Sequence, residues 1–319
     1  MPPLRVKDFF MALFLVFLSG AFVALSNLMM RKSIDSGGTT KGYLVFMMMT
    51  AFGSAVLLEP VRSGNYALNT PVALLGAIAG IILAFMLHFL GKALEKGPPG
   101  FTFSLLSSST VMPAIVMSFL FGASYGFPYT PWHAIGSVLV VGGIFWAGRG
   151  VSGMQDRSRW VLFSAAMFTL HVALLALFQW RSLLLNVPNP EGVSSFFTAE
   201  EIKSVWFLPF MFLTSGIIQL WMFIAGEKRK PKLMEALYGI LGGAINGTGT
   251  FFLIVATSAA TALENAIIFP MYSVAIIVLS NLWGQKLYQE RVNWRACQVC
   301  AVGLIIGTVD WRGLLSVLF

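Results

Sequence analysis

Long apolar stretches separated by short polar breaks fill this chain almost from end to end. A helix needs about 17–25 mostly apolar residues to cross the hydrocarbon core of a bilayer. Ten stretches of about this length follow one another, at 9–30, 42–59, 71–91, 101–121, 132–148, 159–184, 204–225, 236–257, 265–283 and 295–311. The breaks carry turn and charge signals, such as Lys96-Gly97-Pro98-Pro99-Gly100. The pattern predicts an all-α polytopic membrane protein with ten transmembrane helices.

Composition favours the same class and excludes others. Apolar residues make up 57% of the 319 residues and charged ones only 11%, whereas soluble domains carry about 25% charged residues. No stretch is polar and long enough for a separate soluble catalytic domain. The net charge of +8 comes from basic residues in the short breaks. This placement is typical of membrane topology, and we expect no nucleic-acid partner.

The second half of the chain repeats the first. At an offset of 162, the segment from Ile115 to Gly122 matches that from Ile277 to Gly284 at five of eight positions. A weaker match at an offset of 149 relates the first stretch to the sixth. These matches predict two five-helix repeats, at 1–150 and 151–319. Because five is odd, the two copies must be inverted in the membrane, which is a recurrent design of secondary transporters.

The ends of the two repeats carry a family resemblance. Both read Ser-x-Leu-x-Gly, at 118–122 and 280–284, followed by a short loop and then Trp132 or Trp294. With the segment 94–122, they resemble the drug/metabolite transporter superfamily, in its ten-helix EamA-like branch. The resemblance implies ten helices in two inverted repeats and transport of a small solute. The family's charged Gly-Glu-x loop is replaced here by the uncharged 122–127.

Polar residues at membrane depth are costly and mark candidate solute contacts. They gather in the fourth and ninth stretches, which are repeat mates and each contain a proline, Pro113 or Pro270. Single serine hydroxyls can also bond back to their own helix carbonyls, and Asn27, Gln219 and Gln298 are either solute contacts or interhelical bonds. The set that we expect to bind the solute is Ser104, Ser108, Asn246, Asn265 and Tyr272.

Titratable residues in the apolar stretches suggest ion coupling and offer no metal site. Glu264 is a candidate proton-coupling carboxylate, or else an interfacial charge at the start of a helix. His171 is either a core histidine or a protonation switch. The three histidines show no metal-ligand spacing, so we expect neither a metal nor a cofactor. Cys297 and Cys300 form a C-x-x-C inside an apolar stretch, which favours helix packing over redox chemistry.

Small residues and charges complete the prediction. Gly239, Gly243 and Gly247 form a ladder that lets helices approach closely, with Gly76/Gly80 and Gly303/Gly307 as shorter versions. The breaks after odd-numbered stretches hold 15 of the 21 basic residues. By the positive-inside rule these breaks are cytoplasmic, and both termini lie on the non-cytoplasmic side of a plasma membrane, here a bacterial inner membrane.

The sequence therefore predicts a secondary transporter, ion-coupled or facilitative, of a small organic metabolite such as an amino acid, a sugar or a related compound. It contains no G-x-x-x-x-G-K-[ST] loop for ATP. The alternative is an integral membrane enzyme or a flippase acting on lipid or prenyl substrates, although paired acidic residues for metal chemistry are not evident. The expected partners are the solute and the lipid bilayer, and the protein is a monomer or a homodimer.

Overall fold

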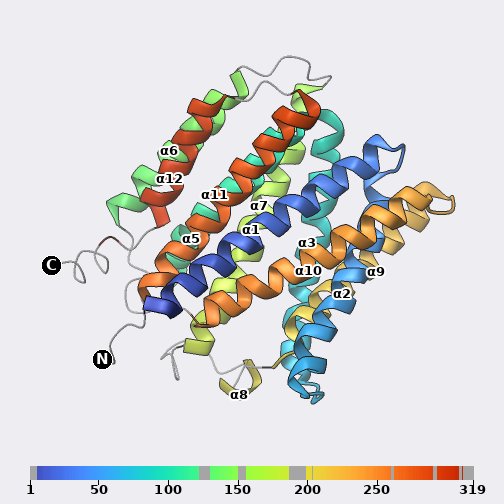
Figure 1. Cartoon of the computed structure of the whole chain (residues 1–319), viewed down its shortest axis with the longest axis horizontal. Helices are drawn as coiled ribbons and strands as arrows, with labels where there is room; N and C mark the ends of the chain where they lie inside the picture. The colour runs from blue at the N-terminus through green and yellow to red at the C-terminus, as the bar shows by residue number, and fades with distance from the viewer. Residues whose placement is uncertain are drawn as a thin grey trace.

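The described part of the chain is all-helical. In this computed structural model, the residues described are 6–121, 130–149, 156–186, 199–202, 204–259, 262–289, 293–308 and 311, and no strand occurs among them. The helices (Figure 1) are α1 (Val6–Asp35), α2 (Thr40–Val56), η1 (Leu57–Val61), α3 (Thr70–Lys96), α4 (Pro99–Ser108), η2 (Ser109–Val111), α5 (Met112–Phe121), α6 (Pro131–Arg149), α7 (Arg157–Asn186), α8 (Ala199–Ile202), α9 (Phe207–Glu227), α10 (Leu233–Ala259), α11 (Ala262–Tyr288) and α12 (Trp294–Thr308).

Six of the helices are long and apolar enough to cross a membrane, counted over the described residues. They are α1, α2 with η1, α3, α7, α9 and α10. Large apolar side chains on their outer faces stay exposed, such as Leu74 and Ile78 on α3 and Trp221 and Ile224 on α9. A monomeric soluble protein rarely exposes such patches. The predicted polytopic helical membrane protein is confirmed at this level.

Each of the ten predicted stretches overlaps helical structure, and several of the helices are longer than their stretches. α1 continues to Asp35 and α3 to Lys96, because a helix can continue into the polar interface after its apolar run ends. Side-chain caps fix two of the starts. The Thr39 hydroxyl accepts from the Gly42 amide at 3.2 Å, and the Asn69 side chain accepts from the Val72 amide at 3.1 Å. Such caps satisfy amides that the first helical turn leaves unpaired.

Helices from the two halves of the chain pack against one another throughout. α1 lies along α10 and α11, α2 packs against α10 and α9, and α3 packs against α9 and α7. α6 pairs with α12, and α4 packs on α11. Figure 1 shows α1 and α10 running side by side, with α6 and α12 as a pair at one edge.

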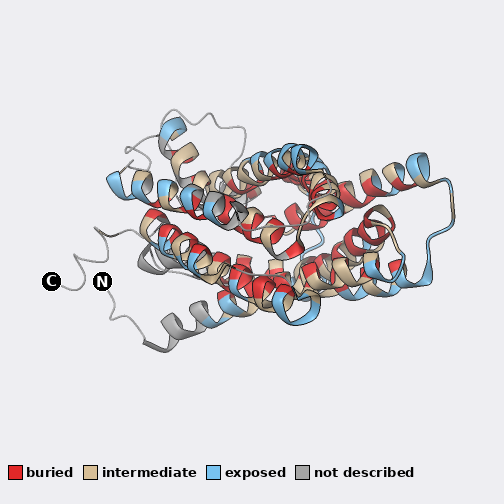
Figure 2. Cartoon of the chain, turned by 90° about the horizontal axis from the view of Figure 1, so that it is seen from above, coloured by how far each residue is buried: buried red, intermediate tan, exposed pale blue. Residues whose placement is uncertain are grey.

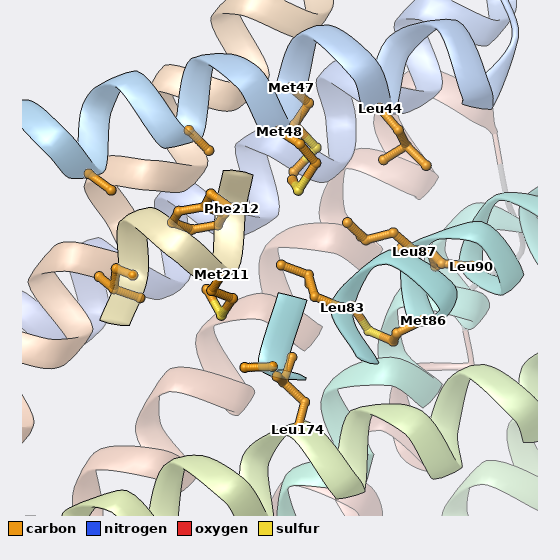
Figure 3. Packing of buried hydrophobic residues seen from close by; sticks show 14 of the residues in the cluster. Leu44, Met47, Met48, Leu83, Met86, Leu87, Leu90, Leu174, Met211 and Phe212 are labelled. Atoms are coloured by element: carbon orange, nitrogen blue, oxygen red, sulfur yellow. The ribbon is translucent and has the colours of Figure 1, made fainter. Parts of the chain in front are cut away.

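The main apolar core lies where α2, α3, α7 and α9 meet. Met48 of α2, Leu87 of α3, Leu174 of α7 and Phe212 of α9 belong to one cluster of buried side chains (Figure 3). Buried residues, red in Figure 2, lie on the faces that helices turn toward one another, and exposed residues lie outside. Without the hydrophobic effect inside lipid, such close packing supplies much of the attraction between helices.

The predicted glycine ladders bring helix backbones together. A Cβ atom on Gly243 of α10 would lie 2.3 Å from the carbonyl oxygen of Met47 on α2. On Gly80 of α3 it would lie 2.4 Å from the carbonyl oxygen of Met211 on α9. Real Cβ contacts are never this short with backbone atoms, so both helix crossings require glycine. The packing interpretation of the ladders is confirmed.

We expect Gly243→Ala to lower the free energy of unfolding by about 1–3 kcal/mol, the usual cost of an overpacked contact. The matched control is Gly53→Ala on α2, where a built Cβ would have no described atom within 4 Å. Because alanine is the better helix former, the control should leave stability unchanged or slightly raised. Chemical unfolding in detergent micelles, followed by circular dichroism, measures both. Equal stability of the two variants would contradict the close approach of α10 and α2.

Candidate functional site

A broken helix, made up of α4, η2 and α5, contacts α11 through polar side chains. The break consists of the 3₁₀ turn η2 between α4 and α5, directly ahead of Met112 and Pro113. Proline has no amide hydrogen, so the carbonyl four residues earlier, on Ser109, loses its α-helical donor. Here the Met112 amide bonds to the Ser109 carbonyl instead, in the tighter 3₁₀ pattern. Pro113, the proline of the polar fourth stretch, therefore lies beside a break in the helix.

The first polar contact across this crossing joins Ser104 of α4 to Asn281 of α11. The Asn281 Nδ2 group donates to the Ser104 hydroxyl at 2.6 Å and to the Ile277 carbonyl at 2.8 Å. Both side chains are buried. A buried polar group without a partner costs about 1–3 kcal/mol. The hydrogen bond therefore holds α4 and α11 together at this level.

The second contact joins the helix break to α11. The hydroxyl oxygens of Thr110 and Ser273 lie 2.6 Å apart, and both side chains are buried. The Thr110 hydroxyl donates to the Ser107 carbonyl at 2.8 Å. Because that uses its single proton, the Ser273 hydroxyl is the donor between the two helices. The crossing thus has a hydrogen bond on each side of Ser108.

On its other side, the break meets His171 of α7. The His171 Nδ1 atom lies 2.5 Å from the Ser109 hydroxyl and 3.1 Å from the Leu106 carbonyl. The Ser109 hydroxyl itself donates to the Leu106 carbonyl at 2.6 Å. A hydrogen on Nδ1 satisfies both oxygens, which favours the tautomer protonated at Nδ1. His171 thus ties α7 to the last turn of α4.

A small pocket lies between α1, α4 and α11, next to the Ser104–Asn281 bond. Its apolar walls include Phe103 of α4 and Trp283 of α11. Its polar lining comes from Asn27 and Arg31 of α1 and from Ser280 of α11. Phe103 and Ser280 are the sequence neighbours of Ser104 and Asn281, so the bond lies beside the pocket. The remaining lining residues are Ala24, Leu28, Pro99, Gly284 and Tyr288.

A network of charged side chains and backbone amides holds loops together at one end of the bundle. Glu235, the first acidic residue of α10, is fully buried and accepts from Arg229 at 2.5 and 3.0 Å. It also accepts from the Thr39 amide at 2.6 Å and the Lys232 amide at 2.7 Å. The hydrogen bonds to Glu235 raise the pKa of the Arg229 guanidinium. The ion pair joins the loop before α10 to that helix, and the bond from Thr39 joins the loop before α2 to the same carboxylate.

Arg31, Lys32, Arg229 and Lys232 lie at one end of the bundle, which we call the basic end. The Lys232 ammonium donates to the Gly37 carbonyl, and Arg31 Nη1 donates to the Leu94 carbonyl at 3.5 Å. These contacts bring together the last turns of α1 and α3, and the loop after α1 with the loop after α9. Gly42 makes room for the network, because a Cβ there would lie 2.4 Å from the Glu235 carboxyl carbon.

The structure places the five predicted solute contacts in different surroundings. Ser104 bonds to Asn281, and the fully buried Ser108 donates to the Ser104 carbonyl at 2.7 Å. Tyr272 packs instead against the apolar cluster of Val16, Leu253 and Ala256. Among the predicted contacts whose side chains the structure describes, Ser104 and Ser108 lie together.

The remaining predicted site residues are Asn246, Glu264 and Asn265. Asn246 is half-buried on α10. The side chains of Glu264 and Asn265 lie outside the described residues, although both positions are helical. The solute-binding set and the coupling role of Glu264 stay predictions.

Sequence reasoning missed most of the residues that join the helices here. At the offset of 162, Asn281 aligns with the apolar Phe119, so the comparison of the two halves did not mark it as a polar position shared by both. Its polar side chain in an apolar stretch was the available signal. The sequence did not predict Arg31 or Ser280 as site residues either, whereas it predicted Asn27 as a solute contact or an interhelical bond. Gln219 proves to be an interhelical bond, since its Nε2 donates to the Ala84 carbonyl at 2.7 Å.

Metal and thiol chemistry can be checked in part. Among the described residues, no three His, Cys, Asp or Glu side chains gather closely enough to hold a metal ion. The absence of a metal or cofactor stays a prediction. Cys300 is buried between α12 and α6, where its Sγ contacts the Val140 carbonyl at 3.6 Å. This contact agrees with a packing role for the C-x-x-C pair.

Comparisons with known proteins identify the fold alone. One solved structure, described only as "Crystal structure of protein", matches with a TM-score of 0.62 at 16% sequence identity. The match covers 97% of this chain and 99% of the other. No family model matches the chain, and no curated protein matches it by sequence. The near-complete coverage shows that the helical arrangement occurs elsewhere as one whole chain.

Proposed function

We propose that the chain is a secondary transporter of a small organic metabolite, built as ten spans in two inverted repeats. The observation that carries the proposal is the crossing of a broken polar helix with α11. Irregular backbone at membrane depth is tolerated only where protein or a water-filled path surrounds it, and discontinuous helices line the sites of many transporters. A purely structural bundle has no need of a break at its polar centre.

The helix packing supports the repeat. The proposal pairs α1 with α7, α2 with α9, α3 with α10, α4–α5 with α11, and α6 with α12. Under this exchange the contact of α1 with α10 becomes that of α7 with α3, and α2–α10 becomes α9–α3. The contact of α1 with α11 becomes that of α7 with α4 and α5. The α2–α9, α4–α11 and α6–α12 contacts map onto themselves, as a two-fold axis requires.

The glycine crossings support the same pairing. Gly76 and Gly80 precede Gly239 and Gly243 by 163 residues each. The first pair brings α3 against α9, and the second brings α10 against α2. These two contacts are equivalent under the proposed exchange. The α6, α11 and α12 helices and the broken α4–α5 would then be the four spans beyond the six counted above.

Orientation is part of the proposal. The basic end carries Arg31, Lys32, Lys232 and Arg229, and the positive-inside rule assigns it to the cytoplasm. Both termini then lie on the other side of the membrane, which we take to be the inner membrane of a bacterium.

Single cysteines should show this orientation. In a background with Cys297 and Cys300 replaced by alanine, an impermeant maleimide should label Asn65→Cys in intact cells and leave Lys230→Cys unlabelled. Both positions are exposed, so lysed cells should label both and serve as the control. Labelling of position 230 alone in intact cells would reverse the orientation.

Uptake into proteoliposomes tests the function itself. A panel of radiolabelled amino acids, sugars and related metabolites should contain at least one that accumulates above protein-free liposomes. The matched control is Asn281→Leu, which removes the bond to Ser104 at similar volume. Folded control protein should lose most of the uptake. If no member of the panel enters but a fluorescent lipid changes leaflets, the lipid alternative replaces the transporter.

A further inference from the structure

We infer that the pocket between α1, α4 and α11 binds the anionic group of a small carboxylate, which makes it a solute subsite at the basic end of the path. This rests on the proposed transport function and names the substrate class. The pocket is defined by its lining residues, above all Asn27, Arg31 and Ser280, with Phe103 and Trp283 as aromatic walls.

Two buried polar groups in the lining point to a ligand. Asn27 is 8% exposed and Ser280 5% exposed. Asn27 Nδ2 and Ser280 Oγ are buried and have no hydrogen-bond partner among the described residues. Such orphaned groups cost about 1–3 kcal/mol each. Both groups can donate a hydrogen bond, so the pocket offers hydrogen to a ligand rich in acceptors.

Arg31 adds positive charge to the same lining. Its Nε atom forms an ion pair with Asp35 Oδ1 at 3.0 Å. The geometry of this pair is not that of a hydrogen bond, so the Nε hydrogen has no acceptor within the described structure. The guanidinium lies 5.5 Å from the ring centre of Tyr288, and the Lys32 ammonium lies 5.7 Å from the same centre. Two cations therefore flank the aromatic ring at the pocket. A carboxylate matches the planar donor fork of an arginine.

The start of α4 has the same sign. Pro99 lines the pocket as the first residue of this ten-residue helix, and no side chain in the described structure caps its amides. Unpaired amides and the helix dipole give a helix start a partial positive charge that attracts anions. The donors, the guanidinium and the helix start thus all favour an anionic group, and Phe103 and Trp283 form apolar walls beside it.

The sign of the pocket can be measured without knowing the solute. In the background lacking native cysteines, Leu28→Cys places a thiol in the half-buried pocket lining and leaves every donor in place. The quantity measured is the reaction rate with the anionic reagent MTSES divided by the rate with the cationic MTSET. We expect this rate ratio to be higher in Leu28→Cys than in the same variant with Arg31→Gln. Removing this charge should lower the rate ratio about tenfold, the scale of one nearby unit charge at protein dielectric.

The matched control is Lys92→Gln, which removes a charge near the basic end but outside the pocket lining. Because Lys92 is half-exposed and pairs with Glu95, its loss should change the ratio by less than about twofold. If Arg31→Gln does not fold, Asn27→Asp provides the second test and should lower the ratio in the same direction. An unchanged ratio in the folded variants overturns the proposal.

Ligand class is tested by protection. Millimolar acetate should slow MTSES modification of Leu28→Cys severalfold, and acetamide, its neutral counterpart of similar shape, should not. The protection should disappear in Arg31→Gln. Equal protection by acetamide would overturn the anionic preference. These rates need no transport, so the pocket can fail while metabolite uptake succeeds, and uptake can fail while the pocket proves anion-selective.

Discussion

Glu235→Ala is expected to lower the free energy of unfolding by about 3 kcal/mol, the scale found when a buried ion pair loses one partner. The carboxylate is fully buried and accepts from Arg229, from the Thr39 amide and from the Lys232 amide. Alanine leaves all these donors without their acceptor. Denaturant unfolding of the purified protein in detergent gives the free-energy difference.

Glu227→Ala is the matched control, because Glu227 also contacts Arg229, through Oε2 at 3.1 Å from Nε. This carboxylate is partly exposed, and exposed ion pairs contribute at most about 1 kcal/mol. We expect the control to change the unfolding free energy by less than that. A control as damaging as Glu235→Ala would mean that the charge balance of the loop, and not the buried acceptor, sets the stability.

In the proposed transporter, bridging α4 to α11 should stop uptake. In the background lacking native cysteines, Ser104→Cys with Asn281→Cys places two thiols where a 2.6 Å hydrogen bond now joins the side chains. A mercuric ion should link the pair, and uptake should fall at least about tenfold, because alternating access requires the two repeats to move against each other. An excess of a dithiol should restore it.

Each single cysteine variant with the same mercury treatment serves as control and should keep most of its uptake. Mass spectrometry of the treated double variant establishes that the bridge has formed. Full uptake by bridged protein would show that α4 and α11 stay together during transport, and the path would then have to lie elsewhere in the bundle.

The sequence predicted the helices well because hydropathy follows the thickness of the bilayer. It also predicted the glycine crossings, since small residues four apart have few other uses in lipid. The hydrogen-bonded pairs were beyond it. Whether Ser104 meets Asn281 or Ala266, its counterpart at the offset of 162, depends on how far α4 is shifted along α11. The apolar side chains of the two helices do not encode that shift. Tyr272 was grouped with Ser104 for this reason, although it packs beside Val16 and Leu253.

The buried ion pair of Glu235 was equally hard to predict from the sequence. Glu235 lies in the first turn of α10, just after a run of basic loop residues, and a carboxylate in such a position is commonly a solvated partner. Its burial follows from Gly42, whose missing side chain gives the carboxyl group its place. A contact made possible by the absence of an atom in a distant helix leaves little trace in a single sequence.

If the chain consists of the two repeats proposed above, the break at η2 has an energetic consequence. α11 runs unbroken from Ala262 to Tyr288 although it contains Pro270, while its mate is divided at Ser109. If the halves exchanged these two shapes, the exchange would produce a second arrangement with the same kinds of contact facing the opposite leaflet. Two arrangements so alike differ little in free energy, so both would be populated at rest. A ligand that prefers one by only about 1.4 kcal/mol would then shift the population ratio tenfold.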